Sequence, residues 1–419
     1  MKKKVSVLAI IGMALMLIVG CSNSSNGSEK KTVKFFNGKV ESVDYMNELI
    51  DQFNKQNSQY KVVQEFQKDA SSAMQTKLAS GDVPDLTNTD VTQEYIDAGK
   101  FEDLSKEDIW NHINPNIKQL VTDIKSGKQY KIATNETMAG IFYNKDLAPE
   151  GIAFDTWDHF ITSLESLQAA NEGKDALYLG GKDSWTLGHL MEFWGHGIVK
   201  EQYSVLEAKK LFINNDQSVL NFASSDGPIY TFAERLAELK EKGLINQNAI
   251  TASYDEQIEK FAKGEAIAIP QGFWAMSAIL QKNKEMNIGF MPFPSMKDGE
   301  KPLLLVAEDS TYAIPSQAKN KEGAKAFLKF ILKEENLKGY SEFMKSPSAF
   351  ENIDSNWSDK KSEFENAKKE SVNIGFTSFP SGFSGDDSGR YVQAFLSGQY
   401  KTAQDFTEAY SEAWNKSKK

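Results

Sequence analysis

The stretch TVKFFNGKVESVDYMNELIDQF, residues 32–53, carries the hydrophobic pattern that decides the fold class. Residues 32–36 are rich in β-branched and aromatic side chains, which is typical of a strand. Apolar residues then recur at spacing i, i+3, i+4 and i+7, which predicts an amphipathic helix: Met46, Leu49, Ile50 and Phe53. Residues 60–66 alternate like a second strand, and residues 70–80 indicate a helix ended by Gly81. This strand–helix–strand–helix order predicts an α/β fold with a parallel sheet.

Further elements are expected along the rest of the chain. Short strands are predicted at 141–143 and 267–269, and helices at 156–171, 230–242, 324–332 and 403–415. Pro292, Pro294, Gly299 and Pro302 lie in a polar stretch after Met291. Such a composition predicts a crossover between two lobes of the molecule.

The N-terminus has the pattern of an export signal, which we assign to residues 1–20. Three lysines precede an apolar run of 15 residues, 5–19, which is shorter than the roughly 20 that span a bilayer. Gly20 then precedes Cys21, the only cysteine of the chain. This arrangement resembles the bacterial lipobox, whose cysteine receives a diacylglycerol; a buried thiol is the alternative. We therefore expect a lipid anchor at Cys21 on the outer face of the cell membrane, followed by a flexible stalk over 21–30.

The charge of the remaining chain narrows the class of ligand. Without residues 1–20 it has 45 basic and 58 acidic residues, a net charge of −13, which argues against binding nucleic acid or anionic lipid. Only Arg235 and Arg390 are arginines. Because anion sites usually rely on the bidentate guanidinium group, an uncharged ligand is favoured.

Six short blocks, in this order, resemble the family 1 extracellular solute-binding proteins of ABC transporters: 77–85, 99–104, 140–147, 155–160, 261–267 and 320–328. KLASGDVPD at 77–85 and GIFYNKDL at 140–147 are similar to the family's "a-s-G-d-x-P-D" and "yNkdlf" motifs. The block DTWDHF at 155–160 departs from the family pattern by lacking its proline and its final acid. Each block alone is weak, and the order of all six carries the resemblance.

The resemblance implies an α/β, two-lobed, periplasmic-binding-protein-like fold with a ligand cleft that closes by a hinge. It implies a first lobe of 31–141 plus 306–345 and a second of 142–305 plus 346–419. Residues 35–41, FFNGKVE, resemble the members that serve raffinose, isomaltose and multiple-sugar importers. The implied function is capture of a neutral oligosaccharide by a monomer, without a cofactor, and its delivery to the permease subunits of an importer.

A sugar offers C–H faces that stack on aromatic rings, and hydroxyls that need fixed polar partners. Aromatic and short polar residues on loops after strands are therefore the candidate ligand-binding residues. They are Lys39, Glu41, Asn88, Asp90, Trp185, Trp194, Phe273, Trp274, Glu308, Asp309, Phe383 and Asp386. The roles of Lys39 and Glu41 are implied by the resemblance.

Structural roles remain open for several of these candidates. Trp194 fits a helix core, 308–309 a hairpin turn and 381–388 a surface linker. Lys39 and Glu41 could form a solvated turn, and Asn88 and Asp90 are ordinary turn residues.

Other functions remain open as well. His189, Glu192 and His196 share a helix face, but a structural role is favoured over metal binding. A surface glycoside hydrolase would need two carboxylates about 5–10 Å apart. A chain with 58 acidic residues always contains some such pair, so the requirement does not discriminate, and no catalytic motif accompanies the acids. A receptor for another solute, an adhesin and a lipoprotein chaperone are further alternatives. Binding without catalysis is the preferred interpretation.

Overall fold

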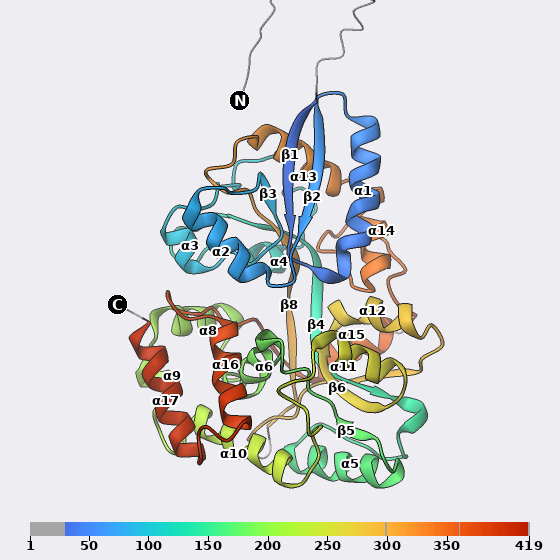
Figure 1. Ribbon diagram of the computed structural model, residues 1–419, viewed down its shortest axis with the longest axis vertical. Helices are drawn as coiled ribbons and strands as arrows, with labels where there is room; N and C mark the ends of the chain where they lie inside the picture. The colour runs from blue at the N-terminus through green and yellow to red at the C-terminus, as the bar shows by residue number, and fades with distance from the viewer. Residues whose placement is uncertain (1–29, 298–299, 360, 418–419) are drawn as a thin grey trace, which may run out of the picture.

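The computed structural model describes residues 30–297, 300–359 and 361–417. The predicted signal peptide, Cys21 and all but the last residue of the predicted stalk lie outside these ranges. Figure 1 shows two lobes, one above the other, with strands β4 and β8 running between them. The predicted two-lobed α/β fold is confirmed.

The first lobe is built on a parallel sheet with strand order β2-β1-β3, as the opening stretch of sequence predicts. Its strands are β1 Lys31–Asn37, β2 Tyr60–Phe66 and β3 Leu86–Thr87. Its helices are α1 Val43–Gln56, α2 Ala70–Ser80, α3 Gln93–Asp97, α4 Pro115–Leu120, α13 Lys321–Ile331 and α14 Glu334–Met344, with a 3-10 turn at Val40–Ser42.

Alternate residues of β1 point to opposite faces of this sheet, and apolar side chains are buried on both faces. Val33 and Phe35 pack in one cluster with residues of α1, α13 and α14, and Phe36 packs in another with residues of α2. Gly81 ends α2 in the left-handed conformation at φ 77°, as predicted.

The second lobe is built on a mixed sheet of order β5-β6-β4-β8-β9, with β7 pairing with β4. Its strands are β4 Ile132–Asn144, β5 Asp175–Leu177, β6 Ala266–Gly272, β7 Ile288–Met291, β8 Leu303–Tyr312 and β9 Val372–Ile374. Its helices are α5 Trp157–Ala170, α6 Ser184–Leu190, a π-helical turn Met191–Gly195, α7 Gly197–Lys200, α8 Val205–Asn214, α9 Gln217–Leu220, α10 Pro228–Glu241, α11 Tyr254–Ala262, α12 Met276–Lys282, α15 Lys361–Glu370, α16 Gly385–Leu396 and α17 Ala403–Lys416. Short 3-10 turns lie at Lys145–Leu147 and Phe273–Ala275.

Two strands carry the chain between the lobes. Ile132 at the start of β4 and Tyr312 at the end of β8 belong to the first core, whereas Met138 and Ala307 belong to the second. The antiparallel ladder between β4 and β8 runs through this region without a break in register. A third crossing lies between Phe350, in the first core, and Trp357, in the second.

These cores suggest lobe boundaries a few residues away from those predicted. We propose boundaries within 134–137, 308–311 and 351–356, since apolar residues on either side pack in different cores. The proline-rich stretch 292–302 is not a crossover, because Phe293 and Met296 both pack in the second core and Phe293 pairs with Leu303. That prediction was wrong.

In the part of the chain that the structure describes, no helix has both the length and the apolarity needed to cross a bilayer.

Candidate functional site

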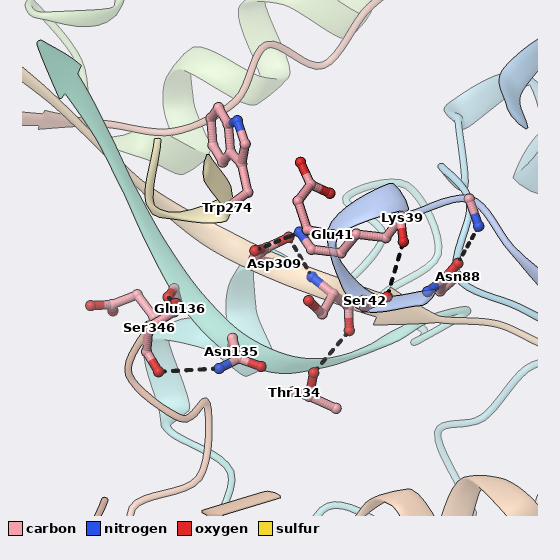
Figure 2. A network of polar contacts seen from close by, with 12 residues as sticks. Lys39, Glu41, Ser42, Asn88, Thr134, Asn135, Glu136, Trp274, Asp309 and Ser346 are labelled. Carbon is pink, nitrogen blue, oxygen red and sulfur yellow. Dashed lines mark hydrogen bonds and ion pairs between the residues drawn. The ribbon is translucent and has the colours of Figure 1, made fainter. Parts of the chain in front are cut away.

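An ion pair lies where β1 and β8 approach the boundary between the lobes. Lys39 follows β1, and its Nζ lies 2.7 and 2.9 Å from the two carboxylate oxygens of Asp309, in the crossing part of β8. The two side chains are only 14% and 15% exposed. Burial opposes the charge on Lys39, yet the carboxylates of Asp309 and Glu41 outweigh burial and raise the pKa of Lys39. Figure 2 shows this pair together with Glu41 and Trp274.

Glu41 connects the two lobes directly. Its Oε1 accepts a hydrogen bond of 2.7 Å from the hydroxyl of Tyr254, which begins α11 in the second lobe. Burial raises the pKa of Glu41, although Lys39 and the Tyr254 hydroxyl act in the opposite direction. The lobes also meet where Lys68 pairs with Asp255 at 2.6 Å.

Asn88 holds the loop that carries Lys39. Its Oδ1 accepts from the backbone N–H of Gly38 at 2.6 Å, and its Nδ2 donates to Oδ1 of Asn37 at 2.8 Å. A Cβ on Gly38 would lie 2.7 Å from Cγ2 of Thr89, so only glycine fits this close approach. Asn88 therefore positions the Lys39 loop.

Asp90 lies at the edge of the same boundary and keeps an exposed side chain. Desolvation by the surrounding lobes raises its pKa, Lys131 lowers it, and the carboxylate of Asp386 in the second lobe raises it again. Asp386 itself accepts a 2.5 Å hydrogen bond from the hydroxyl of Ser184. A carboxylate of the second lobe thus acts on Asp90 across the boundary.

Asp386 lies in a helix rather than in the flexible loop predicted at 381–388. Ser384 caps the first turn of α16 in a capping box with Asp387, which starts the helix at Gly385. The helix packs backbone to backbone on α6: a Cβ on Gly389 would lie 1.8 Å from the carbonyl oxygen of Ser184. This close packing fixes Asp386 beside the first turn of α6.

Five partly or largely buried rings of the second lobe form what we call the aromatic cluster: Trp185, His189, Tyr254, Trp274 and Phe376. Ring centroids are 4.9 Å apart for Trp185 and Tyr254, and 5.3 Å apart for His189 and Trp274. His189 also contacts Trp185 at 5.3 Å and Phe376 at 5.7 Å. Through the Tyr254 hydroxyl, this cluster reaches the polar residues of the first lobe.

A hydrogen bond orients one of these rings, and burial keeps another uncharged. The indole N–H of Trp274 donates to Oε1 of Gln271 at 2.8 Å. Burial, and then the charge of Lys200, lower the pKa of His189 to about 3, so its ring is neutral at physiological pH. The cluster therefore presents uncharged flat surfaces.

Two predicted aromatic candidates lie in the core instead, and neither presents a face to the boundary. Trp194 is 0% exposed and packs edge-on against Trp157 at 5.8 Å. Phe273 is also 0% exposed and lies 4.4 Å from Phe364. The backbone after β6 turns through the 3-10 segment, which sends Phe273 inward while its neighbour Trp274 joins the aromatic cluster.

Two other candidates are largely buried. Phe383 packs 5.0 Å from Trp414, among the rings of the second core. Glu308 is 7% exposed and pairs with Lys131 at 3.2 Å. It lies within β8, not in a hairpin turn, and the charges of nearby Lys209 and Lys131 outweigh burial and lower its pKa.

Sequence reasoning did not select three members of the aromatic cluster, His189, Tyr254 and Phe376. Phe376 could have been found, because it follows strand β9 and a glycine, the same signal that selected Trp274. Tyr254 directly follows the helix cap Ser253, where nothing in the sequence shows that the helix start faces another lobe.

The histidines and glutamate considered for metal binding do not converge. His189 lies among aromatic rings, while His196 bonds Oγ1 of Thr377 at 3.1 Å and the hydroxyl of Tyr410 at 2.9 Å. Over the described ranges, no group of three or more His, Cys, Asp or Glu side chains is placed to hold a metal ion.

A two-lobed α/β molecule with polar and aromatic side chains meeting between the lobes has the architecture of a solute-binding protein. Residues 38–338 match the family described as bacterial extracellular solute-binding protein, and the chain belongs to this family. The family predicted from the sequence blocks is confirmed.

Two relatives match most of the chain. The multiple sugar-binding protein of Streptococcus mutans serotype c is 27% identical over 361 residues, covering 84% of this chain and 83% of its own length. The melibiose/raffinose/stachyose-binding protein MelE of Bacillus subtilis is 25% identical over 366 residues, covering 84% of this chain and 82% of its own length.

Solved structures share the fold. RafE in complex with raffinose superimposes with a TM-score of 0.74 at 23% identity, covering 93% of this chain and all of that one. A sugar transporter from Bacillus licheniformis in complex with stachyose gives 0.75 at 22% identity, covering 91% of this chain and all of that one.

Proposed function

We propose that this chain is the substrate-binding component of an ABC importer, which captures a neutral oligosaccharide between its lobes and delivers it to the membrane permease. The names of both relatives support a sugar as the ligand. The proposed action is reversible binding with closure of the hinge, and no bond of the ligand is broken.

The observation that carries this proposal is the meeting of the aromatic cluster with polar residues of the other lobe at the Glu41–Tyr254 contact. Flat rings suit the C–H faces of a sugar, and fixed carboxylates and amines suit its hydroxyls. Opposite charges in the Lys39–Asp309 pair compensate each other, which favours an uncharged ligand.

We assign these predicted residues to three roles: stacking, hydroxyl binding and structural support. Trp185 and Trp274 supply stacking surfaces. Hydroxyl partners come from both lobes: Lys39, Glu41, Asp90, Asp309 and Asp386. Asn88 supports the loop of Lys39, whereas Glu308 and Phe383 have structural contacts within the protein.

Isothermal titration calorimetry of the chain from Ser22 onward tests this function. Melibiose, raffinose and stachyose are the probes, with an amino acid and inorganic phosphate as charged controls. Saturable binding of one or more saccharides, with recovery of the intact sugar, is expected. Binding of a control instead would exclude the sugar proposal, and release of monosaccharide would indicate a glycoside hydrolase.

We further propose that Cys21 carries the lipid anchor and that residues 21–30 form the stalk, which places the lobes outside the membrane. The lipobox-like sequence at the end of the apolar run supports this assignment. Cys21→Ser should abolish incorporation of radiolabelled palmitate in bacterial cells that export the protein. Equal labelling of this variant and the wild type would contradict the anchor.

A further inference from the structure

A buried ion pair of the second lobe lies outside the polar residues and the aromatic cluster described above, although the charge of Lys200 acts on His189. Glu192, in the π-helical turn, and Lys200, at the end of α7, have side chains 4% and 2% exposed, with Nζ 3.9 Å from Oε1. Burial raises the pKa of Glu192 and lowers that of Lys200, which shows that the fold disfavours both charges. A π-helical turn and a desolvated pair together mark a place where stability is not the only requirement.

Both charged groups bind the backbone of one segment, residues 375–377. The Lys200 ammonium donates to the carbonyl of Gly375 at 3.0 Å. The backbone N–H of Thr377 donates to the Glu192 carboxylate. The residue between these two anchored positions is Phe376.

The same segment is held from a third direction, since Oγ1 of Thr377 bonds Nδ1 of His196 at 3.1 Å. Lys200 is fixed in turn by the carbonyl of Glu192 at 3.0 Å. Hydrogen bonds from charged groups to backbone are stronger than those between neutral groups. The pair therefore clamps a connection that lies outside helix and strand, between β9 and α16.

Phe376 itself is partly buried and contacts two other rings of the aromatic cluster. Its ring lies 5.7 Å from His189 and 6.4 Å from Trp274, tilted by 34° and 30°. Phe376 thus extends the contact between His189 and Trp274 by a third ring.

We propose that Phe376 is a third stacking residue for the sugar, and that Glu192 and Lys200 are positioning residues that hold its ring in place. This inference rests on the proposed function. The physical reason is preorganisation: a ring on an irregular segment would lose conformational freedom on binding, and a clamp made beforehand removes that loss.

Four variants test the clamp, with raffinose titrated calorimetrically. Phe376→Ala should weaken binding about 3- to 10-fold, the range of one stacking contact. Glu192→Leu and Lys200→Met should each approach this loss, because each frees one end of the segment. Glu192→Gln keeps an oxygen that accepts from Thr377 and should bind within about twofold of the wild type.

A matched control separates positioning from a general loss of stability. Glu201 is the next residue after Lys200, has a side chain 4% exposed, and pairs with Lys297 at 3.5 Å, away from the Phe376 segment. Glu201→Leu removes a buried glutamate of the same kind and should leave raffinose affinity unchanged. An equal loss in this variant would overturn the clamp.

Double substitutions give the decisive comparison. In a Phe376→Ala background, Glu192→Leu or Lys200→Met should cost less than a further twofold, since the ring that they position is gone. A full additional loss would show that the pair acts in some other way, and unchanged affinity in Phe376→Ala alone would remove the stacking role.

The position of the ring can also be read without ligand. In protein labelled with 5-fluorotryptophan, the Trp274 resonance, assigned by its disappearance in Trp274→Phe, should shift in Phe376→Ala and move similarly in Lys200→Met. If it shifts in the first variant but not in the second, the clamp is wrong. Wild-type protein that binds no saccharide would instead overturn the proposed function and the sugar contact, while these spectra still decide the positioning.

Discussion

At the scale of single residues, the two tryptophans of the aromatic cluster carry the first prediction. Trp185→Ala and Trp274→Ala should each weaken saccharide binding by the energy of a stacking contact, about 0.5–1.5 kcal/mol beyond the lost contact area. Calorimetry with the best ligand of the panel measures this. Trp194→Phe is the control, because that core side chain should affect stability and leave affinity unchanged. Unchanged affinity in both alanine variants would mean that the site lies elsewhere.

The neutral histidines give a second prediction. Burial holds the pKa of His189 at about 3 and that of His196 well below its ordinary value, whereas both titrate near 6.5 when unfolded. Below pH 6.5 the unfolded chain therefore binds protons that the folded chain does not. The protein's free energy of unfolding should therefore fall on acidification from pH 7 to 5.5, by about 1 kcal/mol for each of these two histidines.

Urea denaturation of wild type and His196→Gln at both pH values measures this effect. The difference between the two pH values should be about 1 kcal/mol smaller in the variant. The raised pKa of Glu192 acts in the opposite direction over the same range, so the comparison between variants is more informative than the wild-type slope. An identical difference in both proteins would contradict a neutral His196.

Neighbouring residues show why the site was only partly predictable. The pattern of strand, glycine and aromatic residues correctly selected 272–274, yet Phe273 is fully buried, whereas Trp274 packs on the core and also lies in the aromatic cluster. The 3-10 turn that separates them depends on tertiary packing. Trp185 and Trp194 likewise share one continuous helical region, and only the surrounding rings decide which is buried.

At the scale of elements, the crossing part of β8 contains a strained residue. Ser310 has φ 50°, the left-handed region that disfavours side chains with a Cβ branch. Ser310→Val should lower the free energy of unfolding by about 2 kcal/mol. Ser310→Gly should stay within about 1 kcal/mol of wild type, since relief of strain offsets the lost hydrogen bond to Tyr340. Urea denaturation of both variants measures this, and equal stabilities would contradict the strain.

Elements with strong local signals were predicted closely. Strand 60–66 and helix 70–80 match β2 and α2, because alternation and helical spacing are local properties. The long strands β4 and β8 were not recognised at full length. Their middle residues, such as Asn135 and Asp309, are polar since they pass between two cores, and an apolar strand pattern stops there although the ladder continues.

At the scale of the whole molecule, the contact between Glu41 and Tyr254 predicts a closed state that can be weakened selectively. Tyr254→Phe keeps the ring against Trp185 and removes only the inter-lobe hydrogen bond. Because hydrogen bonds to charged groups contribute about 1.5–3 kcal/mol, the variant should release its ligand on the order of tenfold faster or more. Stopped-flow fluorescence measures this rate.

Lys68→Ala is the matched control for that variant. Lys68 also reaches the other lobe, through Asp255, but both side chains are largely exposed, 75% and 59%. Surface ion pairs contribute little, so this change should alter the release rate less than twofold. Equal acceleration in both variants would show that the Tyr254 hydroxyl has no special part in closure.

The constant register between β4 and β8 also limits how this chain can change over evolution. Side chains alternate sides along a strand. One residue inserted or deleted where the ladder passes between the cores would therefore turn the core-facing side chains of one lobe outward, while those of the other lobe kept their direction. Length variation can therefore accumulate in surface loops and at the third crossing, but not in these two strands. Exchange of whole lobes between relatives would succeed only where both proteins have the same register between β4 and β8.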